Sequence, residues 1–431
     1  MRQSDTAIEA SIDGAIASML KDGIVRQDRE EVFRFQPVRR LSAAHADFPD
    51  SPVLIRSRPS MQIRTTPLQS PSIGTQRTLT SFHFGPADAG RKIYLQAALH
   101  ADETPAMLAA FVLKQRLAQL DAAGRLAAGI VLVPVANPVG LNHHLLGQFI
   151  GRFDLASGRN FNRGFLPLAE IAARARDRLG DDPERNRAIV RECVGAALDD
   201  IAPRTEFDAL QLALLKLSHD ADVVIDLHCS LEAVMHVYTS DTAWPEVEPL
   251  ARYLGADVSL LADDSGGHAF DDAHHLLWSQ LRRHLPDGTP MAAGTVAVTV
   301  ECRGQRDVTY EYAERDADAL VDYLVWCGAV RGERAPLPPL AAPATPLAGS
   351  EQFYAPVSGI LVHRAAIGAT IRAGDPLFDI VDPLTDAITT ISSGTDGVFY
   401  MRRAIRFVTA GAPLGRVTGT VPVRTGMLLG A

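Results

Sequence analysis

The chain has 431 residues, of which 47% are hydrophobic and 22% are charged, a composition typical of folded globular proteins rather than disordered ones. A chain of this length is too long for one compact core, so we expect two domains. The net charge of −9 and the lack of a lysine and arginine cluster argue against nucleic acids and membranes as partners.

The N-terminal segment is predicted to be a polar helix over residues 1–30, an arm that packs on a neighbour in a possible homo-oligomer. It lacks an apolar core of signal-peptide length, and no run in the chain reaches roughly 18 uninterrupted apolar residues. We therefore predict a soluble, cytoplasmic protein. Residues 31–38 and 76–85 alternate apolar and polar side chains, as half-buried strands do.

Continuous apolar runs come next, and they are typical of strands covered on both faces of a sheet. Helical stretches separate most of these runs, and residues 105–124 are the clearest example. Strands that alternate with helices predict an α/β fold with a mixed sheet flanked by helices. The four runs are 92–99, 129–136, 222–227 and 295–300.

The domain boundaries follow from changes in composition. Residues 1–330 are predicted to form the larger domain, with a helix-rich insertion at 168–219 that roofs or flanks the functional site. Residues 331–350 are rich in proline and alanine and are predicted to be a semi-rigid linker. In residues 351–431, short strands are punctuated by glycine, aspartate and proline, which predicts a small all-β, barrel-sandwich-like domain.

Polar residues stand where the four apolar runs end. His100 and Glu103 follow the first run, the sequence NPVGLN follows the second, His228 follows the third and Glu301 follows the fourth. Ligands of α/β proteins gather at such strand ends, because the loops there are free to carry polar groups. We therefore expect these side chains to share one site.

The His100 and Glu103 pair has two readings when it is taken alone. In the first, Asp102 or Thr104 caps the following helix, Pro105 takes its first position and the histidine is incidental. In the second, the histidine and the glutamate are ligands of one metal ion. The local sequence does not decide between these readings.

The rest of the chain favours the metal. Two histidines and one carboxylate are a standard three-ligand set for catalytic zinc, and His228 supplies the second histidine. A carboxylate that is not a ligand can take a proton and return it to a leaving nitrogen, and Glu301 is the candidate. Asp226, two residues before His228, either orients that imidazole or accepts a hydrogen bond at the strand end.

The loop 151–165 holds three arginines and two asparagines. A guanidinium near a metal hydroxide can stabilise an oxyanion, or it can hold a substrate carboxylate through a two-point contact. The five side chains are Arg152, Arg159, Asn160, Asn162 and Arg163.

Taken in order, these motifs resemble the succinylglutamate desuccinylase/aspartoacylase family of the zinc carboxypeptidase clan. The motifs are His-x-x-Glu after a strand, an NP-x-G strand exit, an arginine-rich loop ending in NFNRGF, a later DLH and a strand-ending VEC. The resemblance covers residues 90–330, and the small β domain also fits it. It implies a zinc-carboxypeptidase-like fold. Members of the family remove an acyl group from the nitrogen of an amino acid, whereas the wider clan removes C-terminal residues from peptides.

The resemblance implies a role for each matching residue of the metal site. His100, Glu103 and His228 are similar to the ligands of one zinc ion per chain, and Glu301 is similar to the general acid/base.

It also implies roles in the loop. Arg152 is similar to the arginine that polarises the scissile carbonyl, and Asn162 with Arg163 is similar to the pair that grips the substrate's free carboxylate. The segment between Arg152 and NFNR is longer than in the family's shorter versions, which read close to RY…DLNR. Arg159 is therefore an alternative to Arg152 in the oxyanion role.

The C-terminal domain resembles a barrel-sandwich hybrid of the biotinyl/lipoyl type. An attached cofactor would need a lysine at the hairpin tip, and no lysine occurs after Lys216. A swinging-arm carrier is therefore excluded. We predict that the domain is structural and either limits entry to the site or builds an oligomer.

The sequence thus predicts a zinc-dependent amidohydrolase that removes an N-acyl group from an amino acid or a similar small zwitterion. One alternative is a zinc carboxypeptidase that acts on peptides. The other is a non-catalytic binding protein that retains the fold.

Overall fold

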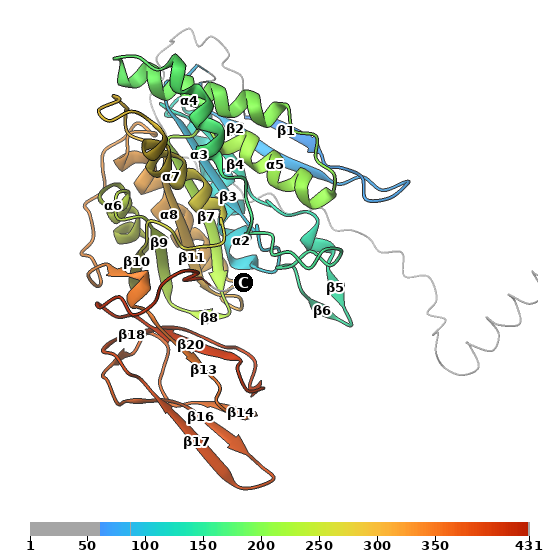
Figure 1. Ribbon diagram of the computed structural model, residues 1–431, viewed down its shortest axis with the longest axis vertical. Helices are drawn as coiled ribbons and strands as arrows, with labels where there is room; N and C mark the ends of the chain where they lie inside the picture. The colour runs from blue at the N-terminus through green and yellow to red at the C-terminus, as the bar shows by residue number, and fades with distance from the viewer. Residues whose placement is uncertain (1–60, 87, 430–431) are drawn as a thin grey trace, which may run out of the picture. The chain divides into compact units, whose positions relative to one another are not determined.

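The computed structural model describes residues 61–86 and 88–429 (Figure 1). The predicted arm at 1–30 and the predicted strand at 31–38 lie outside the described residues. Within these described ranges, no helix combines the length and the apolar character that crossing a membrane requires.

A nine-stranded mixed sheet is the centre of the larger domain, with the strand order β1-β2-β4-β3-β7-β11-β9-β10-β12. Neighbours run parallel from β4 through β3 and β7 to β11, whereas β2 pairs antiparallel with β4, and β9 with β11. The strands are β1 (Gln62–Pro67), β2 (Thr78–Phe84), β3 (Lys92–Ala97), β4 (Gly129–Val133), β7 (Val223–Ser230), β9 (Met235–Thr239), β10 (Val258–Leu261), β11 (Val296–Gly304) and β12 (Thr345–Pro346).

The four apolar runs of the sequence form the parallel centre of this sheet, as β3, β4, β7 and β11. Side chains that alternate along one strand are buried on opposite faces: Tyr94 and Leu95 are both fully buried, and they belong to different hydrophobic clusters. Because both faces are covered, the runs need no polar alternation.

Helices cover both faces of the sheet (Figure 1). One face packs against α2 (Thr104–Ala122), α6 (Trp244–Leu254) and α8 (Tyr310–Trp326). The other face packs against α3 (Leu168–Ala172), α4 (Pro183–Asp199), α5 (Glu206–Ser218) and α7 (Phe270–Leu281). The predicted insertion at 168–219 thus supplies three of the helices on the second face and flanks the sheet.

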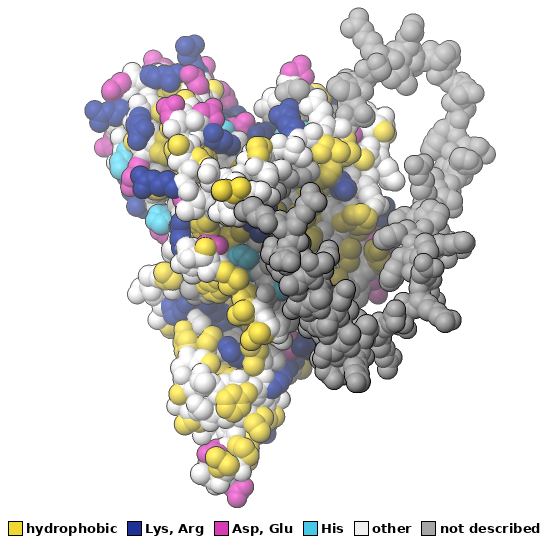
Figure 2. All heavy atoms as spheres, turned by 90° about the vertical axis from the view of Figure 1, so that its right-hand side faces the viewer, with side chains coloured by type: hydrophobic (Ala, Val, Ile, Leu, Met, Phe, Trp, Pro, Cys, Tyr) yellow, Lys and Arg dark blue, Asp and Glu magenta, His cyan; other side chains and the backbone are white. Residues whose placement is uncertain are grey.

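The C-terminal region contains two antiparallel sheets around an apolar core that includes Phe378 and Phe399. The first sheet holds β13 (Glu351–Tyr354), β20 (Pro413–Val417), β18 (Gly397–Arg402) and β15 (Thr370–Ile371), and the second holds β17 (Ala387–Ser392), β16 (Pro376–Asp382), β14 (Gly359–His363) and β19 (Phe407–Val408). Figure 2 shows hydrophobic side chains exposed on this region, where Ile388 and Phe407 are more than half exposed. The predicted fold class, a mixed sheet flanked by helices and followed by an all-β region, is confirmed.

Two strand pairings are among the contacts between the larger domain and the segment from the linker onward. Within 331–350, β12 adds a parallel edge strand next to β10, and the Pro338 carbonyl accepts a hydrogen bond of 2.6 Å from Arg252 Nε. In addition, β8 (Glu232–Ala233) pairs with β18 immediately after the strand that carries His228. The predicted linker therefore lies along the larger domain, while the domain bounds themselves stay a prediction.

Candidate metal centre

The chain turns sharply between β3 and α2, and this turn presents His100 and Glu103. Ala98 adopts a positive φ of 60°, which turns the chain out of the strand. The N-cap position of α2 is Glu103 itself, without a side-chain capping bond, and Pro105 lies in the first turn. Asp102 accepts a hydrogen bond of 2.8 Å from Gln305 Nε2. Neither Asp102 nor Thr104 therefore caps the helix, and Glu103 is left to face the neighbouring strand.

Three buried side chains converge at this point. Glu103 Oε1 lies 2.9 Å from His100 Nδ1, and Glu103 Oε2 lies 2.7 Å from His228 Nδ1. One donor atom from each residue lies within 4.8 Å of the other two, and each residue is at most 3% exposed. Two ligand atoms that each lie about 2.0–2.2 Å from one zinc ion must lie within roughly 4.4 Å of each other. The separations between the three donor atoms are close to this limit, so the three residues fit a metal ion.

The outer nitrogen of each imidazole faces an oxygen acceptor. His100 Nε2 lies 2.8 Å from Asn160 Oδ1, which also accepts a hydrogen bond from the Asn162 backbone N–H. His228 Nε2 lies 2.9 Å from Asp226 Oδ2. This distance is that of an ion pair, but the two groups are not aligned for a hydrogen bond. Acceptors at these positions leave both Nδ1 atoms free to bind a metal, as partners of ligand histidines do.

A chain of buried polar groups supports Asp226 from behind. Gln96 Nε2 donates to Asp226 Oδ1 at 3.0 Å, and Tyr94 Oη donates to Gln96 Oε1 at 2.8 Å. All three side chains are fully buried on neighbouring strands β3 and β7. The hydrogen bonds across these strands fix the carboxylate, and through it the orientation of His228.

The electrostatics favour a positive charge between these side chains. Burial alone would lower the pKa of His228, but the carboxylates of Asp226 and Glu103 hold this pKa well above its ordinary value. Burial would likewise raise the pKa of Glu103, but His100 and His228 hold it well below the usual range. A divalent cation satisfies the same carboxylates, so the donor set suits a metal electrostatically as well as geometrically.

Glu301 lies beside this cluster without belonging to it. It is paired in register with His228 across β11 and β7, and its Oε2 accepts a hydrogen bond of 3.2 Å from Ser230 Oγ. Burial and the negative charge of Glu103 raise the pKa of Glu301 to about 7. A carboxyl group with a pKa near neutrality can both accept and donate a proton.

Two arginines of the loop 151–165, Arg152 and Arg159, contact different parts of the structure. Arg152 Nη2 donates to Glu103 Oε1 at 2.7 Å. Arg159 instead pairs with Asp208 at 2.9 Å and stacks over the Phe207 ring at 4.0 Å, at the start of α5. The structure thus brings Arg152, and not Arg159, to the predicted ligands.

Asn162 and Arg163 also lie at the site. Asn162 Oδ1 accepts the Phe270 N–H at 2.8 Å, and its Nδ2 lies 3.4 Å from His228 Nε2. Arg163 Nη1 donates to its neighbour's carbonyl, Asn162 O, at 2.6 Å. Gly267, with φ of 81°, passes close to Arg163, because a Cβ at this glycine would lie 2.8 Å from Arg163 Cδ. The loop before α7 thus packs closely on Arg163, and a larger residue at this position would make the arginine side chain shift.

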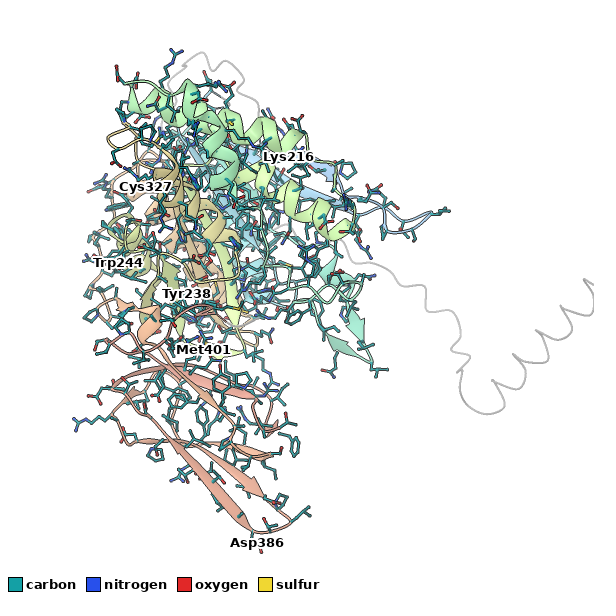
Figure 3. All side chains as sticks on the ribbon, in the orientation of Figure 1. Lys216, Tyr238, Trp244, Cys327, Asp386 and Met401 are labelled. Carbon is teal, nitrogen blue, oxygen red and sulfur yellow. The ribbon has the colours of Figure 1, made fainter. Side chains whose placement is uncertain are left out.

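These side chains open into one cavity of about 570 Å³. One wall holds His100, His228, Glu301, Arg152, Asn162 and Arg163, and the facing wall comes from the C-terminal β region. Tyr238 and Met401, which Figure 3 labels, line the cavity from the larger domain and from β18 respectively. A hollow of about 610 Å³ at the amino ends of β3 and β4 contains none of the predicted site residues.

Two residues beside the predicted ligands had no role predicted from the sequence. Asn160 stands in the arginine-rich loop, and its type and position there assign it no partner. Ser230 lies two residues after His228 on the same strand face, a period that indicates a shared site. Gln352 and Arg416 reach the cavity from the C-terminal region, and no local signal pointed to them.

Comparisons with known proteins support the family resemblance. The model of the succinylglutamate desuccinylase/aspartoacylase catalytic domain matches residues 89–325. No curated protein sequence matches the chain.

Solved structures of three proteins share the fold. A protein assigned to this family from Shewanella amazonensis is 24% identical, with a TM-score of 0.71, over 83% of this chain and 98% of that one. A second, from Shewanella frigidimarina, is 23% identical, with a TM-score of 0.72, over 84% and 97%. The product-bound ectoine utilization protein EutE from Ruegeria pomeroyi is 16% identical, with a TM-score of 0.60, over 88% and 100%.

Proposed function

Since the chain belongs to the succinylglutamate desuccinylase/aspartoacylase family, we propose that it is a zinc-dependent amidohydrolase that removes an N-acyl group from an amino acid or a similar small zwitterion. The family has a hydrolase-like fold. That the metal is zinc and that the substrate is an N-acyl amino acid are parts of this proposal. One observation carries the proposal: a non-ligand carboxylate, Glu301, lies beside three convergent metal-ligand candidates in one cavity.

His100, Glu103 and His228 would hold the metal. Two imidazole nitrogens and one carboxylate oxygen are a donor set typical of catalytic zinc, with a fourth position left for water or substrate. When bound, zinc supplies a hydroxide at neutral pH, because it lowers the pKa of its water to about 7.

Two further residues of the chain act on the reacting amide in this proposal. Glu301 accepts the proton of the attacking water and delivers it to the departing nitrogen, which its pKa of about 7 suits. Arg152 lies at the edge of the cavity beside Glu103 and can donate hydrogen bonds to the oxyanion that develops on the carbonyl.

Asn162 and Arg163 are proposed to hold the free carboxylate of the amino acid. A carboxylate inside a partly buried cavity is costly unless a cation meets it, and arginine offers two parallel hydrogen bonds in the carboxylate plane. Arg163 lines the cavity, and the loop at Gly267 packs closely against its side chain.

The same machinery could serve a carboxypeptidase, and the shape of the cavity favours the deacylase. Residues of β18 and β20 line the cavity opposite the metal ligands. A volume of about 570 Å³ lies in the range of small-molecule sites. A peptidase would instead need a groove that admits an extended chain.

A substrate panel tests the proposal. Zinc-loaded and chelator-treated protein are incubated with N-acyl amino acids and with peptides that share the same C-terminal residue, and the released amine is measured. We expect turnover of the N-acyl amino acids that depends on the metal. Faster cleavage of the peptides would favour the carboxypeptidase, and metal binding without any turnover would favour a non-catalytic protein.

A further inference from the structure

The cavity beside the metal-ligand candidates has an apolar part that the proposed reaction does not use. We call this part the apolar end, and it consists of six side chains that line the cavity. They are Phe149, Ile150, Phe153, Leu231, Met401 and Ile405. Hydrocarbon walls recognise a ligand by the apolar surface that they remove from water, so this end suits a hydrophobic group.

Most of these side chains are not part of a hydrophobic core. Phe153 and Leu231 are each 37% exposed, and Ile405 is 59% exposed. Within the part of the chain that the structure describes, Met401 alone of the six packs against a core cluster. Exposed apolar side chains that gather in one place are typical of binding surfaces. The apolar surface of this end is therefore available to a ligand.

Contacts between distant segments bring the apolar end together on one side of the metal ligands. Gly151 packs against the turn that carries the first ligands, since a Cβ at this glycine would lie 2.6 Å from Asp102 N. Gln305 Nε2 donates to Asp102 Oδ2 at 2.8 Å, and the Gln305 backbone N–H donates to Leu231 O at 3.2 Å. Met401 reaches the same side because β18 pairs with β8, which begins directly after Leu231.

Arg163, the proposed carboxylate-binding residue, contacts different segments of the chain. Its side chain packs against Gly267, and Gly164 N donates to Gly267 O at 2.9 Å. Burial lowers the pKa of Arg163, and the Asp271 carboxylate at the start of α7 opposes this effect. Arg163 is thus placed by α7 and the loop before it, whereas the apolar end is placed by Gln305 and β8.

This separation relates the two ends of the cavity to the two ends of a substrate. In an N-acyl amino acid, the scissile carbonyl lies between the acyl chain and the carbon that bears the carboxylate. With the carboxylate at Arg163 and the carbonyl beside Glu301 and the metal ligands, the acyl chain extends away from α7. The apolar end lies on that side.

The cations near the apolar end differ in their partners. Arg152 donates to Glu103 Oε1 at 2.7 Å, and Arg402 pairs with Glu232 at 2.7 Å. Arg403 also lines the cavity, and within residues 61–86 and 88–429 its Nε has no hydrogen-bond partner. Arg403 therefore supports a rival hypothesis, in which it attracts an anionic acyl group. Six apolar side chains surround this one cation, so we favour an apolar acyl group.

We propose that the apolar end binds the acyl group of the substrate, and that this group is an unbranched alkanoyl chain longer than acetyl. The inference rests on the proposed deacylase function and deepens it, because it names the class of acyl group. Hydrolysis of such a substrate adds water across the amide bond and releases a free amino acid and an apolar carboxylic acid.

The experiment compares zinc-loaded wild type with two double variants. Leu231→Ser with Ile405→Ser removes apolar surface from the apolar end. Leu384→Ser with Ile388→Ser is the matched control, because these residues are 92% and 63% exposed and lie outside the cavity lining. The substrates are N-acetylalanine, N-butanoylalanine, N-hexanoylalanine and N-succinylalanine. Butanoyl and succinyl groups have the same length and differ only in the terminal carboxylate.

In the wild type, kcat/KM should rise by about three- to fourfold for each added methylene that is buried, or about 10²-fold from acetyl to hexanoyl. Leu231→Ser with Ile405→Ser should reduce this hexanoyl-to-acetyl ratio to below about tenfold. The control should keep the ratio of the wild type. The absence of a rise with chain length, or an equal loss in the control, would overturn the proposal. A preference for succinyl over butanoyl would instead assign this end of the cavity to Arg403.

A binding measurement separates this inference from the proposed function. Calorimetry with acetate and with hexanoate needs no turnover, and hexanoate should bind the wild type more tightly. Leu231→Ser with Ile405→Ser should lose this difference. If the wild type hydrolyses none of the panel but shows the difference, the deacylase alone is rejected. If the difference is absent from the wild type or survives in the double variant, the apolar end does not bind the chain. Should the double variant fail to fold, Ile405→Ser alone should show a smaller loss of the same sign.

Discussion

The two walls of the cavity hold their charged residues in different ways. On the wall formed by the sheet and its loops, Glu103 contacts both His100 and His228. Behind His228, the Asp226 carboxylate accepts a hydrogen bond from Gln96, which in turn accepts one from Tyr94. On the wall from the C-terminal region, Arg416 donates a hydrogen bond to the side-chain amide oxygen of Gln352. The charged groups of the first wall are thus arranged around one another and around the expected position of a cation. The charge of Arg416 on the second wall is met by the neutral amide of Gln352.

This difference suggests that the two walls have different roles, one in metal binding and the other in the choice of substrate. The three metal-ligand candidates of the sheet wall contact one another, so a change at Glu103, which touches both histidines, should remove metal binding altogether. Residues of the facing wall depend less on their neighbours, so a change there should alter which substrate is used. The following predictions test this comparison, beginning with the largest expected effect.

Glu103→Gln should have the largest effect, because Glu103 bridges both histidines. We expect zinc content after dialysis to fall from about one equivalent per chain to near zero, as measured by elemental analysis. Turnover should fall by more than the roughly 10²–10⁴-fold that loss of an acid/base costs. The exposed Glu170→Gln serves as the matched control and should keep its zinc. Full zinc retention by Glu103→Gln would remove this residue from the ligand set.

Glu301→Gln should separate metal binding from chemistry within the sheet wall. The amide keeps the shape of the side chain but cannot take up the proton, so kcat should fall by about 10²–10⁴-fold while zinc content stays at the wild-type level. Steady-state kinetics and elemental analysis on the same sample check both parts. Near-normal kcat in zinc-replete protein would assign the proton transfer to another group.

Arg163→Lys tests whether Arg163 binds the carboxylate of the amino acid. Lysine keeps the charge but loses the two-point contact, so kcat/KM for an N-acyl amino acid should fall by about 10- to 150-fold. The matching carboxamide should lose much less. If both substrates lose the same factor, Arg163 braces its loop through the Asn162 carbonyl and does not read a carboxylate.

The smallest expected effect concerns His236 on β9, whose ring contacts Tyr238 of the same strand and Tyr400 of the C-terminal region. Its Nδ1 donates to Val234 O at 2.8 Å, and its ring contacts those of Tyr238 and Tyr400. Burial, with a further contribution from the charge of Arg416, lowers the pKa of His236 to about 4. Between this value and its ordinary pKa of about 6.5, the unfolded chain binds a proton that the folded protein does not, so stability falls as the pH falls.

The free energy of unfolding should therefore decrease by about 2 kcal/mol between pH 7.5 and pH 5 on account of His236, at about 1.4 kcal/mol per pKa unit. Denaturant titrations at the two pH values measure this decrease. His236→Gln should be less stable at pH 7.5 but should lose less stability on acidification. An unchanged pH dependence in the variant would show that His236 does not contribute.

Much of the fold and part of the site could be predicted from local sequence. The continuous apolar runs identified β3, β4, β7 and β11, because a strand buried on both faces needs no alternation. The same runs located His100, Glu103, His228 and Glu301, because parallel strands place their carboxyl ends on one edge of the sheet. The convergence of these residues is thus largely a consequence of strand order.

Other features were decided only by the tertiary structure. The sequence left open whether Arg152 or Arg159 reaches the metal ligands, since both lie in one irregular loop. The choice depends on Asp208 and Phe207 in α5, which hold Arg159 away from the cavity. Arg416 lies more than a hundred residues beyond the last of the predicted ligands, in a region whose own pattern indicates only short strands. Its strand, β20, pairs with β18, and β18 pairs with β8 just after the strand that carries His228. Arg416 therefore lines the same cavity as His228, and such contacts between strands distant in sequence depend on packing that no local pattern records.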